Sequence, residues 1–319
     1  MSERNDPIRM GVSACLLGQE VRYDGGHKLD RFVRDILGMY VEFVPVCPEV
    51  EYGLSIPRES MRLEGSPEAP RLVTHKTRID HTDGMTRWAK NRVEELAREE
   101  LCGFVFKSKS PSSGMARVRV YDPNGFPSNS GVGIFARIFM DRFPLLPVED
   151  EGRLNDLGLR ENFIERVFVL KRWRDLLKER KNVGGLVDFH TKHKLLLLAH
   201  SQGHYREMGK LVAEAKNLDT AELFSRYETL LSTALRLRAT PAKHVNVLQH
   251  MLGYFKKELT TDEKQEMLDI IISYRKGNVP LIVPITLMNH YVRKYGQPYL
   301  GEQIYLNPHP IELKLRNHA

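Results

Sequence analysis

Apolar and polar positions follow two different patterns in the two halves of this 319-residue chain. In the first half, three short apolar runs at 8–14, 41–46 and 103–107 are rich in Val, Ile and Phe and predict buried β-strands. Amphipathic stretches at 28–37 and 82–101 predict the helices that connect them. Strands that alternate with helices indicate an α/β domain with a mostly parallel sheet and flanking helices.

Polar and acidic residues then separate this region from a long helical region. The run RVRVYD at 117–122 predicts an edge strand and 132–142 a helix, and the Pro-rich and acidic stretch at 146–158 predicts a domain boundary. We therefore expect an α/β domain at 1–150 and a separate all-α domain at 151–319. The helical pattern of the second region covers 160–180, 186–201, 204–216, 219–236, 241–258, 260–276 and 280–295.

Each of the three predicted strands ends in a loop with chemically active residues. Cys15 follows the first strand, Cys47 and Glu49 follow the second, and Ser110 follows the third. Loops at the carboxyl ends of parallel strands meet in one crevice, where ligands bind. The sequence therefore predicts that these four residues are neighbours.

The residue types in these loops suit catalysis, although each also has an ordinary structural explanation. A cysteine just beyond a buried strand can direct a thiolate into the crevice, but most free cysteines are small buried apolar residues. Pro48 fixes the turn between Cys47 and Glu49, and a partly desolvated carboxylate there can act as a general acid or base. The segment 107–114 combines hydroxyls with Lys107 and Lys109, a composition that suits an anion or a polarised carbonyl.

Composition and charge narrow the class of protein. Only three cysteines occur, without a CxxC pair, which argues against a disulfide framework and a zinc ribbon. The absence of an apolar run of ~20 residues and of an apolar leader predicts a cytoplasmic protein with no membrane association. The net charge is +7, and 186–319 holds 18 Lys and Arg against 13 Asp and Glu, which favours a polyanionic partner.

Several longer motifs resemble two known families. The segments SACLLG (13–18), VRYDGGHK (21–28), VPVCPEVEYGL (44–54), PRE (57–59) and FKSKSPSSG (106–114) resemble the TudS thiouracil desulfidases. In the second half, the resemblance is to the YbgA-like domain. The combination looks like the RudS-type desulfidases, which act on 4-thiouridine in tRNA. The segments of the second half are DFHTKHKLLLLAHS (188–201), HVNVLQHMLGYF (244–255) and SYRKGNVPLIVPI (273–285).

The resemblance implies a cofactor and roles for named residues. It implies a 4Fe-4S cluster held by three cysteines, with the fourth iron open to the sulfur of a thiolated base, so that water attacks the base carbon. Carried over by position, Cys15 and Cys47 are cluster ligands, and Glu49 is the proton-transfer carboxylate. Ser110 positions the substrate, with Ser112, Lys107 and Lys109 as further substrate-binding residues.

The third cluster ligand is where the chain departs from this pattern. The family motif usually reads SPSCG, and Ser113 stands at the cysteine position. Cys102 is the remaining thiol, but it lies at the opposite end of the strand 103–107, roughly 17 to 20 Å away at ~3.3 Å per residue. Three possibilities follow: Ser113 or another group replaces the thiolate, the strand assignment is wrong and Cys102 reaches the site, or the cluster is weak or absent.

The second half carries nine of the twelve histidines and three segments in which aromatic and basic residues alternate. His190, His193 and His200 share a helical pattern without a matching carboxylate, so core or RNA-contacting histidines are favoured over a metal site. Segments 254–257 and 291–295, with Tyr274-Arg275-Lys276 between them, suit base stacking and phosphate neutralisation.

Three functions are consistent with the sequence. The first is a tRNA 4-thiouridine desulfidase, with a catalytic first domain and an RNA-binding second domain. The second is a non-catalytic RNA-binding or regulatory protein whose first domain has lost its cluster, and the third is a desulfidase of free thiolated pyrimidines.

Overall fold

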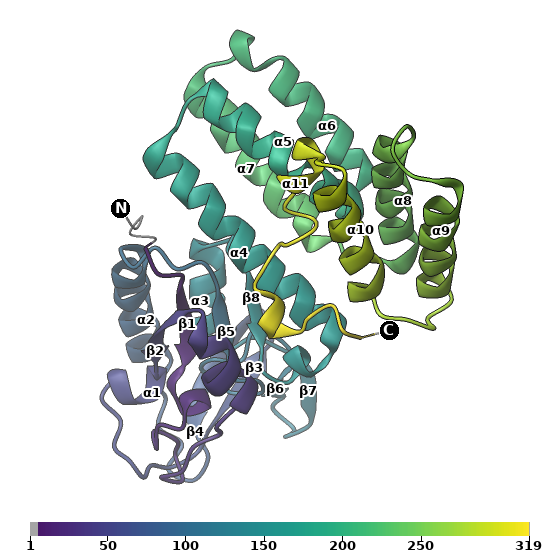
Figure 1. Ribbon diagram of the computed structural model, residues 1–319. Helices are drawn as coiled ribbons and strands as arrows, with labels where there is room; N and C mark the ends of the chain where they lie inside the picture. Colours follow the sequence, from purple (N-terminus) through teal and green to yellow (C-terminus); the bar gives the residue numbers. More distant parts are fainter. Residues whose placement is uncertain (1–5, 319) are drawn as a thin grey trace. The chain divides into compact units, whose positions relative to one another are not determined.

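The computed structural model describes residues 6–318 and separates into two compact units, Met1–Asp156 and Leu157–Ala319. Strands occur in the first unit and long helices in the second (Figure 1). None of the helices within 6–318 combines the length and the apolar character that crossing a bilayer requires.

The first sheet of the α/β unit consists of four parallel strands in the order β2-β1-β5-β8. The predicted strands are confirmed as β1 (Arg9–Ser13), β2 (Glu42–Val46) and β5 (Phe104–Phe106). The fourth strand, β8 (Val148–Asp150), lies inside the stretch expected to be a domain boundary. This strand was not predicted because two of its three residues are acidic and it forms no apolar run. Glu149 and Asp150 are nevertheless buried, each with 6% exposure.

A second sheet has the order β4-β3-β6-β7. The run at 117–122 does form a strand, β6 (Val118–Tyr121), but the prediction that it edges the first sheet is wrong, because β6 pairs with β3 and β7. Periodicity identifies a strand without identifying its partner, and the other three strands of this sheet were not predicted. They are β3 (Met61–Ser66), β4 (Ala69–Thr74) and β7 (Pro127–Gly131).

Two of the three helices predicted in this unit are regular α-helices, and the third is not. Helices α2 (Thr82–Ala97) and α3 (Ile134–Arg142) match the predicted ones closely. The stretch 28–37 forms only a π-helical turn at Phe32–Ile36 and a 3-10 turn at Leu37–Met39.

Aromatic side chains pack β5 against α3. The ring of Phe104 stacks on Phe106, with ring centroids 4.2 Å apart, and lies 4.7 Å from the ring of Phe139 in α3.

The helical unit confirms the predicted all-α class. The largest deviation is in α8, which ends at Leu252 and continues as a 3-10 turn at Gly253–Phe255. Its core includes the buried side chains of Trp173, Tyr227 and Phe255. The long helices are α4 (Leu157–Glu179), α5 (Val183–His200), α6 (Gln202–Ala213), α7 (Thr220–Arg236), α8 (Pro241–Leu252), α9 (Thr261–Arg275) and α10 (Ile282–Lys294), followed by the short α11 (Pro298–Gly301).

Candidate functional site

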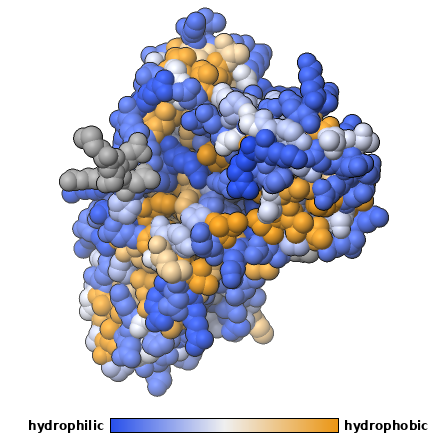
Figure 2. Space-filling model, viewed as in Figure 1, coloured by the Kyte–Doolittle hydropathy of each residue, from blue (hydrophilic) through white to orange (hydrophobic). Residues whose placement is uncertain are grey.

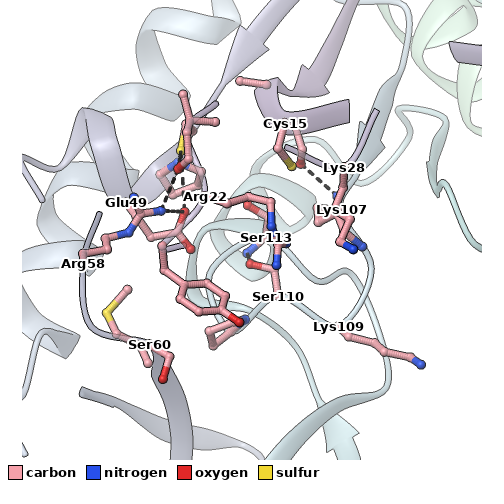
Figure 3. Close-up of a pocket in the computed structure, with 18 of the residues that line it drawn as sticks. Cys15, Arg22, Lys28, Glu49, Arg58, Ser60, Lys107, Lys109, Ser110 and Ser113 are labelled. Atoms are coloured by element: carbon pink, nitrogen blue, oxygen red, sulfur yellow. Dashed lines mark hydrogen bonds and ion pairs between the residues drawn. The ribbon is translucent and has the colours of Figure 1, made fainter. Parts of the chain in front are cut away.

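The loops after β1, β2 and β5 meet around a pocket of about 450 Å³. Cys15, Cys47, Glu49, Ser110 and Ser113 all line it. Figure 3 shows Glu49 beside Arg58 on one side of the pocket and Cys15, with Lys28 and Lys107, on the other. The parallel sheet thus gathers residues that are far apart in the sequence at the carboxyl ends of its strands.

Backbone hydrogen bonds hold both cysteines in place. Cys15 lies in a 3-10 turn after β1, and its carbonyl accepts hydrogen bonds from the amides of Gly18 (3.3 Å) and Lys28 (3.0 Å). Gly18 has φ = +90°, a conformation that favours glycine. Cys47 links β2 to the short helix α1 (Pro48–Glu51), and its amide donates to a Glu51 carboxylate oxygen at 2.8 Å.

The two thiols are buried, and neither takes part in a disulfide. Burial raises the pKa of Cys15 to about 11 and, together with the Glu49 carboxylate, raises the pKa of Cys47 to about 12. The protein alone therefore keeps both groups protonated. A bound metal cation reverses this preference, because it stabilises the thiolate directly.

Glu49 is connected to the third loop through a chain of hydroxyls. Ser112 donates to Glu49 Oε1 at 2.5 Å, and the hydroxyls of Ser110 and Ser112 are 3.0 Å apart. The other carboxylate oxygen of Glu49 lies 3.7 Å from Cys47 Sγ and 3.5 Å from the Arg58 guanidinium. One carboxylate thus contacts a thiol, a cation and a hydroxyl that leads toward the pocket.

Helix α3 anchors the loop that carries these serines. The amides of Phe135 and Ala136 donate to the carbonyl of Ser112 at 2.9 and 3.2 Å, which satisfies two N–H groups at the start of the helix. A Cβ atom on Gly133 would lie 2.5 Å from the Ser112 carbonyl group, so only glycine permits this approach. Ser112 itself is 0% exposed and reaches the site through its hydrogen bonds rather than by lining the pocket.

The two lysines of this loop are placed differently. Lys107 lines the pocket, but its ammonium group forms an ion pair with Glu151 and donates to the Ser108 hydroxyl at 3.1 Å. Lys109 also lines the pocket, is exposed and has φ = +60°. Lys109 is therefore the cation of the pair that is available to an incoming ligand.

The structure separates the two candidates for the third cluster ligand. Ser113 lines the pocket, whereas Cys102 does not. The Cys102 amide donates to the carbonyl of Arg9 at 2.7 Å, which places Cys102 beside the start of β1, while Cys15 follows the end of that strand. Among residues 6–318 no cluster of three or more His, Cys, Asp or Glu is arranged to hold a metal ion.

Sequence reasoning missed Arg58 and Glu151. Arg58 has a 7% exposed side chain and binds both Glu49 and the carbonyl of Val21, at 2.9 Å. Glu151 accepts hydrogen bonds from the amide and hydroxyl of Ser108, both at 2.7 Å. Arg58 lies in the PRE motif (57–59), so its place in that motif could have identified it as a site residue. Glu151 gave none, because it follows the unrecognised strand β8.

In the helical unit, most of the aromatic side chains expected to stack on bases are part of the core. Phe255, Tyr274 and Tyr291 are at most 7% exposed, and the hydroxyl of Tyr295 donates to Glu263 at 2.7 Å. Of the five aromatic side chains, Tyr254 has the largest exposure, 38%. The stacking interpretation is therefore wrong for these buried rings, since their spacing reflects helix packing.

The three histidines of α5 are also buried and hydrogen-bonded. His190 contacts the Tyr227 hydroxyl at 3.1 Å, and His193 contacts the carbonyl of Phe189 at 2.7 Å. His200 contacts Glu165 and, at 2.6 Å, the carbonyl of Leu237. These contacts agree with the sequence-based preference for core histidines over a metal site.

Each of the two regions of the chain matches a protein-family model. Residues 10–151 match the family model for 2-thiouracil desulfurase, and residues 194–310 match the model for DUF1722, a protein family of unknown function. The uncharacterized protein YbgA of Escherichia coli K12 is 35% identical over 155 residues, 48% of this chain and 90% of YbgA. Among solved structures, a 4Fe-4S-dependent thiouracil desulfidase, TudS, is 31% identical with a TM-score of 0.39 and covers 48% of this chain and 96% of TudS. The chain therefore belongs to the family of YbgA, and its residues 10–151 form a thiouracil desulfurase-like domain.

Proposed function

We propose that this chain is a desulfidase that converts a thiolated pyrimidine into the corresponding oxo-pyrimidine, with 4-thiouridine in tRNA as its substrate. The family match over residues 10–151 supports the reaction class. The observation that carries the proposal is the pocket itself, in which the two buried thiols and the Glu49 carboxylate follow β1 and β2 and meet Ser110 and Ser113 from the loop after β5.

The donor set fits an iron-sulfur cluster with mixed ligation. Cys15 and Cys47 provide two thiolates, and Ser113 provides a hydroxyl oxygen in the same pocket. Such clusters are usually held by cysteine thiolates alone, so the Ser113 oxygen makes this site unusual. When bound, the cluster supplies an iron that acts as a Lewis acid toward the sulfur of the substrate.

The residues of the chain account for orientation and proton transfer. The Ser110 hydroxyl donates its proton to Ser112, so its oxygen accepts a hydrogen bond from the ring N–H of the pyrimidine. Arg58 and Ser112 hold the Glu49 carboxylate in a fixed orientation. Glu49 accepts a proton from the attacking water. A carbon–oxygen bond forms, the carbon–sulfur bond breaks, and the sulfur departs as sulfide.

Charge supports RNA as the form in which the substrate is presented. Arg22, Lys28 and Lys109 line the pocket that contains the reacting groups. The excess of Lys and Arg over Asp and Glu is larger in 186–319 than in the rest of the chain. Basic residues neutralise phosphates without reading the base, so they favour a polynucleotide over a free base.

A second candidate function rests on Ser113. If an oxygen at this position does not support a cluster, the chain is an RNA-binding protein without desulfidase activity. A free thiolated pyrimidine is the alternative substrate if the cluster is present and RNA is not bound.

One experiment separates these functions. The full chain, purified and assayed without oxygen, is given tRNA that contains 4-thiouridine, free 4-thiouridine and free 2-thiouracil in parallel, and released sulfide is measured. We expect the highest kcat/KM with tRNA. Sulfide from the free compounds alone would assign a free pyrimidine substrate, and no sulfide from any of them would contradict desulfidase activity.

A further inference from the structure

A second cavity lies within the helical unit, apart from the residues used above. It has a volume of about 430 Å³ and lies between one face of α10 and the C-terminal segment 306–317. Ile282, Ile285 and Val292 line it from α10, and Leu306 and Leu315 from the segment. Its size is typical of small-ligand sites, which are usually apolar with a few polar groups.

Five polar side chains of the lining have no partner within residues 6–318, whereas Thr286, His309 and Arg316 do have partners. No hydrogen bond or ion pair involves the side chains of Asn289, Asn307 or Asn317, and the same is true of the cations Arg293 and Lys314. The neighbouring Lys294, in contrast, is paired with Glu263 at 2.6 Å. Three amides and two cations around one cavity form an unused set of hydrogen-bond donors.

The segment that forms the second wall is held firmly. Arg316, which is 3% exposed, donates to the carbonyl of Tyr305 at 2.6 Å and is paired with Glu161 at 3.2 Å and Glu165 at 3.4 Å. The amide of Ile282 donates to the carbonyl of Arg316 at 3.1 Å. These contacts tie the two walls of the cavity together.

The charges at the cavity select the ligand class. Arg293 and Lys314 contribute positive charge, and the lining holds no carboxylate. Of the acidic groups nearby, Glu161 and Glu165 are paired with Arg316, and Glu302 is paired with Lys192 at 3.8 Å. Glu312 is exposed to solvent. Arginine, lysine and amide groups are the side chains that bind phosphate oxygens. The apolar wall formed by Ile282, Ile285 and Val292 offers a surface for a sugar or a base. On the visible face of the molecule hydrophilic residues dominate, with hydrophobic residues exposed between them (Figure 2).

We propose that this cavity binds a ribonucleotide, with its phosphate at Arg293 and Lys314 and its base or ribose on the apolar face of α10. The inference deepens the proposed action on RNA and rests on it for the source of the ligand, a nucleotide within an RNA strand. A free mononucleotide presents the same chemistry. The site differs from the stacking segments predicted from sequence, because it uses Arg293 without the buried ring of Tyr291 beside it.

Two variants of the full chain test the charge contribution. Arg293→Gln with Lys314→Asn removes both cations, and asparagine tolerates the left-handed backbone of Lys314, whose φ is +52°. The matched control, Lys264→Gln with Arg206→Gln, removes one exposed lysine of α9 and one exposed arginine of α6, both outside the cavity. Asn289→Leu narrows the cavity without changing the charge.

Binding is measured by fluorescence anisotropy with tRNA at several salt concentrations, and with uridine monophosphate as competitor. We expect the cavity double variant to weaken tRNA binding about tenfold or more and to reduce the salt slope by about 1 to 2, while the control changes affinity less than about threefold. Asn289→Leu should also weaken binding. If uridine monophosphate displaces tRNA from the wild type but not from the cavity double variant, the ligand of the cavity is a free nucleotide and not a nucleotide within an RNA strand.

The outcome is separable from the fate of the desulfidase proposal. Sulfide release from free 4-thiouridine by the cavity variants should equal that of the wild type, because no cavity residue lines the cysteine pocket. Loss of RNA binding in a chain that releases no sulfide leaves the cavity inference intact. If the cavity double variant and Asn289→Leu both bind tRNA and mononucleotide like the control, the inference is overturned.

Discussion

The hydroxyl of Ser112 donates to the Glu49 carboxylate at 2.5 Å, although the two residues are 63 positions apart in the sequence. Glu49 belongs to the loop after β2 and Ser112 to the loop after β5. The orientation of the proposed proton acceptor is therefore set by a different loop, which α3 in turn anchors. This connection makes the carboxylate and the third loop a single functional unit.

Glu49→Gln preserves the shape of the side chain but removes its ability to accept a proton. We expect kcat to fall by about 10² to 10⁴, while iron content stays at the wild-type level. Steady-state sulfide release together with iron analysis measures both quantities. Unchanged turnover would identify Glu49 as an ordinary loop residue.

Ser112→Ala tests the positioning of that carboxylate. The variant loses a hydrogen bond to a charged group, which corresponds to about 10- to 100-fold in kcat. The KM for the substrate should change little, because Ser112 does not line the pocket. Ser130→Ala, at an exposed position of β7, is the control. Equal activity of the two variants would show that the Ser112 contact has no catalytic role.

Ser113→Cys and Cys102→Ala, made separately, test the third ligand position. Ser113→Cys should raise the iron content per chain, since it places a third thiol in the pocket that already holds Cys15 and Cys47. Cys102→Ala should leave the iron content unchanged, because Cys102 lies at the opposite end of the sheet. The reverse result would mean that Cys102 reaches the cluster.

The stability of the helical unit should depend on pH through Glu165. Burial alone raises the pKa of this carboxyl, but His200 and Arg316 outweigh it and hold the pKa at about 2, below its ordinary value of 4.5. The stabilisation is therefore present above about pH 4.5 and is lost as the pH falls toward 2.

Urea unfolding followed by helix circular dichroism between pH 5 and 3 measures this effect. Glu165→Gln should be less stable than the wild type at pH 5, and its free energy of unfolding should fall less with acid. Parallel curves for the two proteins would show that Glu165 is not the group responsible.

The sequence predicted the parts of the fold that depend on local pattern. The strands β1, β2 and β5 are short apolar runs, and the rule that parallel strands end at one edge was sufficient to bring Cys15, Cys47, Glu49 and Ser110 together. The helices of the second unit followed from their 3.6-residue period.

The remaining features depend on contacts between distant segments. Strand β8 is acidic and short, and its place beside β5 comes from backbone pairing that no pattern encodes. The ion pair of Lys107 with Glu151 also depends on the pairing of β8 with β5. Without that pairing, the sequence indicated only that Lys107 is a cation beside the predicted site. The aromatic and basic segments of the helical unit suggested base stacking for a related reason. The same alternation of aromatic and basic residues occurs in an amphipathic helix whose aromatic side chains pack into the core.

The most direct test of the central claim is the iron and sulfide content of the full chain purified without oxygen, measured beside its sulfide release from tRNA that contains 4-thiouridine. We predict stoichiometric iron and inorganic sulfide, conversion of 4-thiouridine to uridine, and loss of both iron and activity in Cys47→Ala. A folded wild-type chain that contains no iron after anaerobic reconstitution and releases no sulfide would contradict the account.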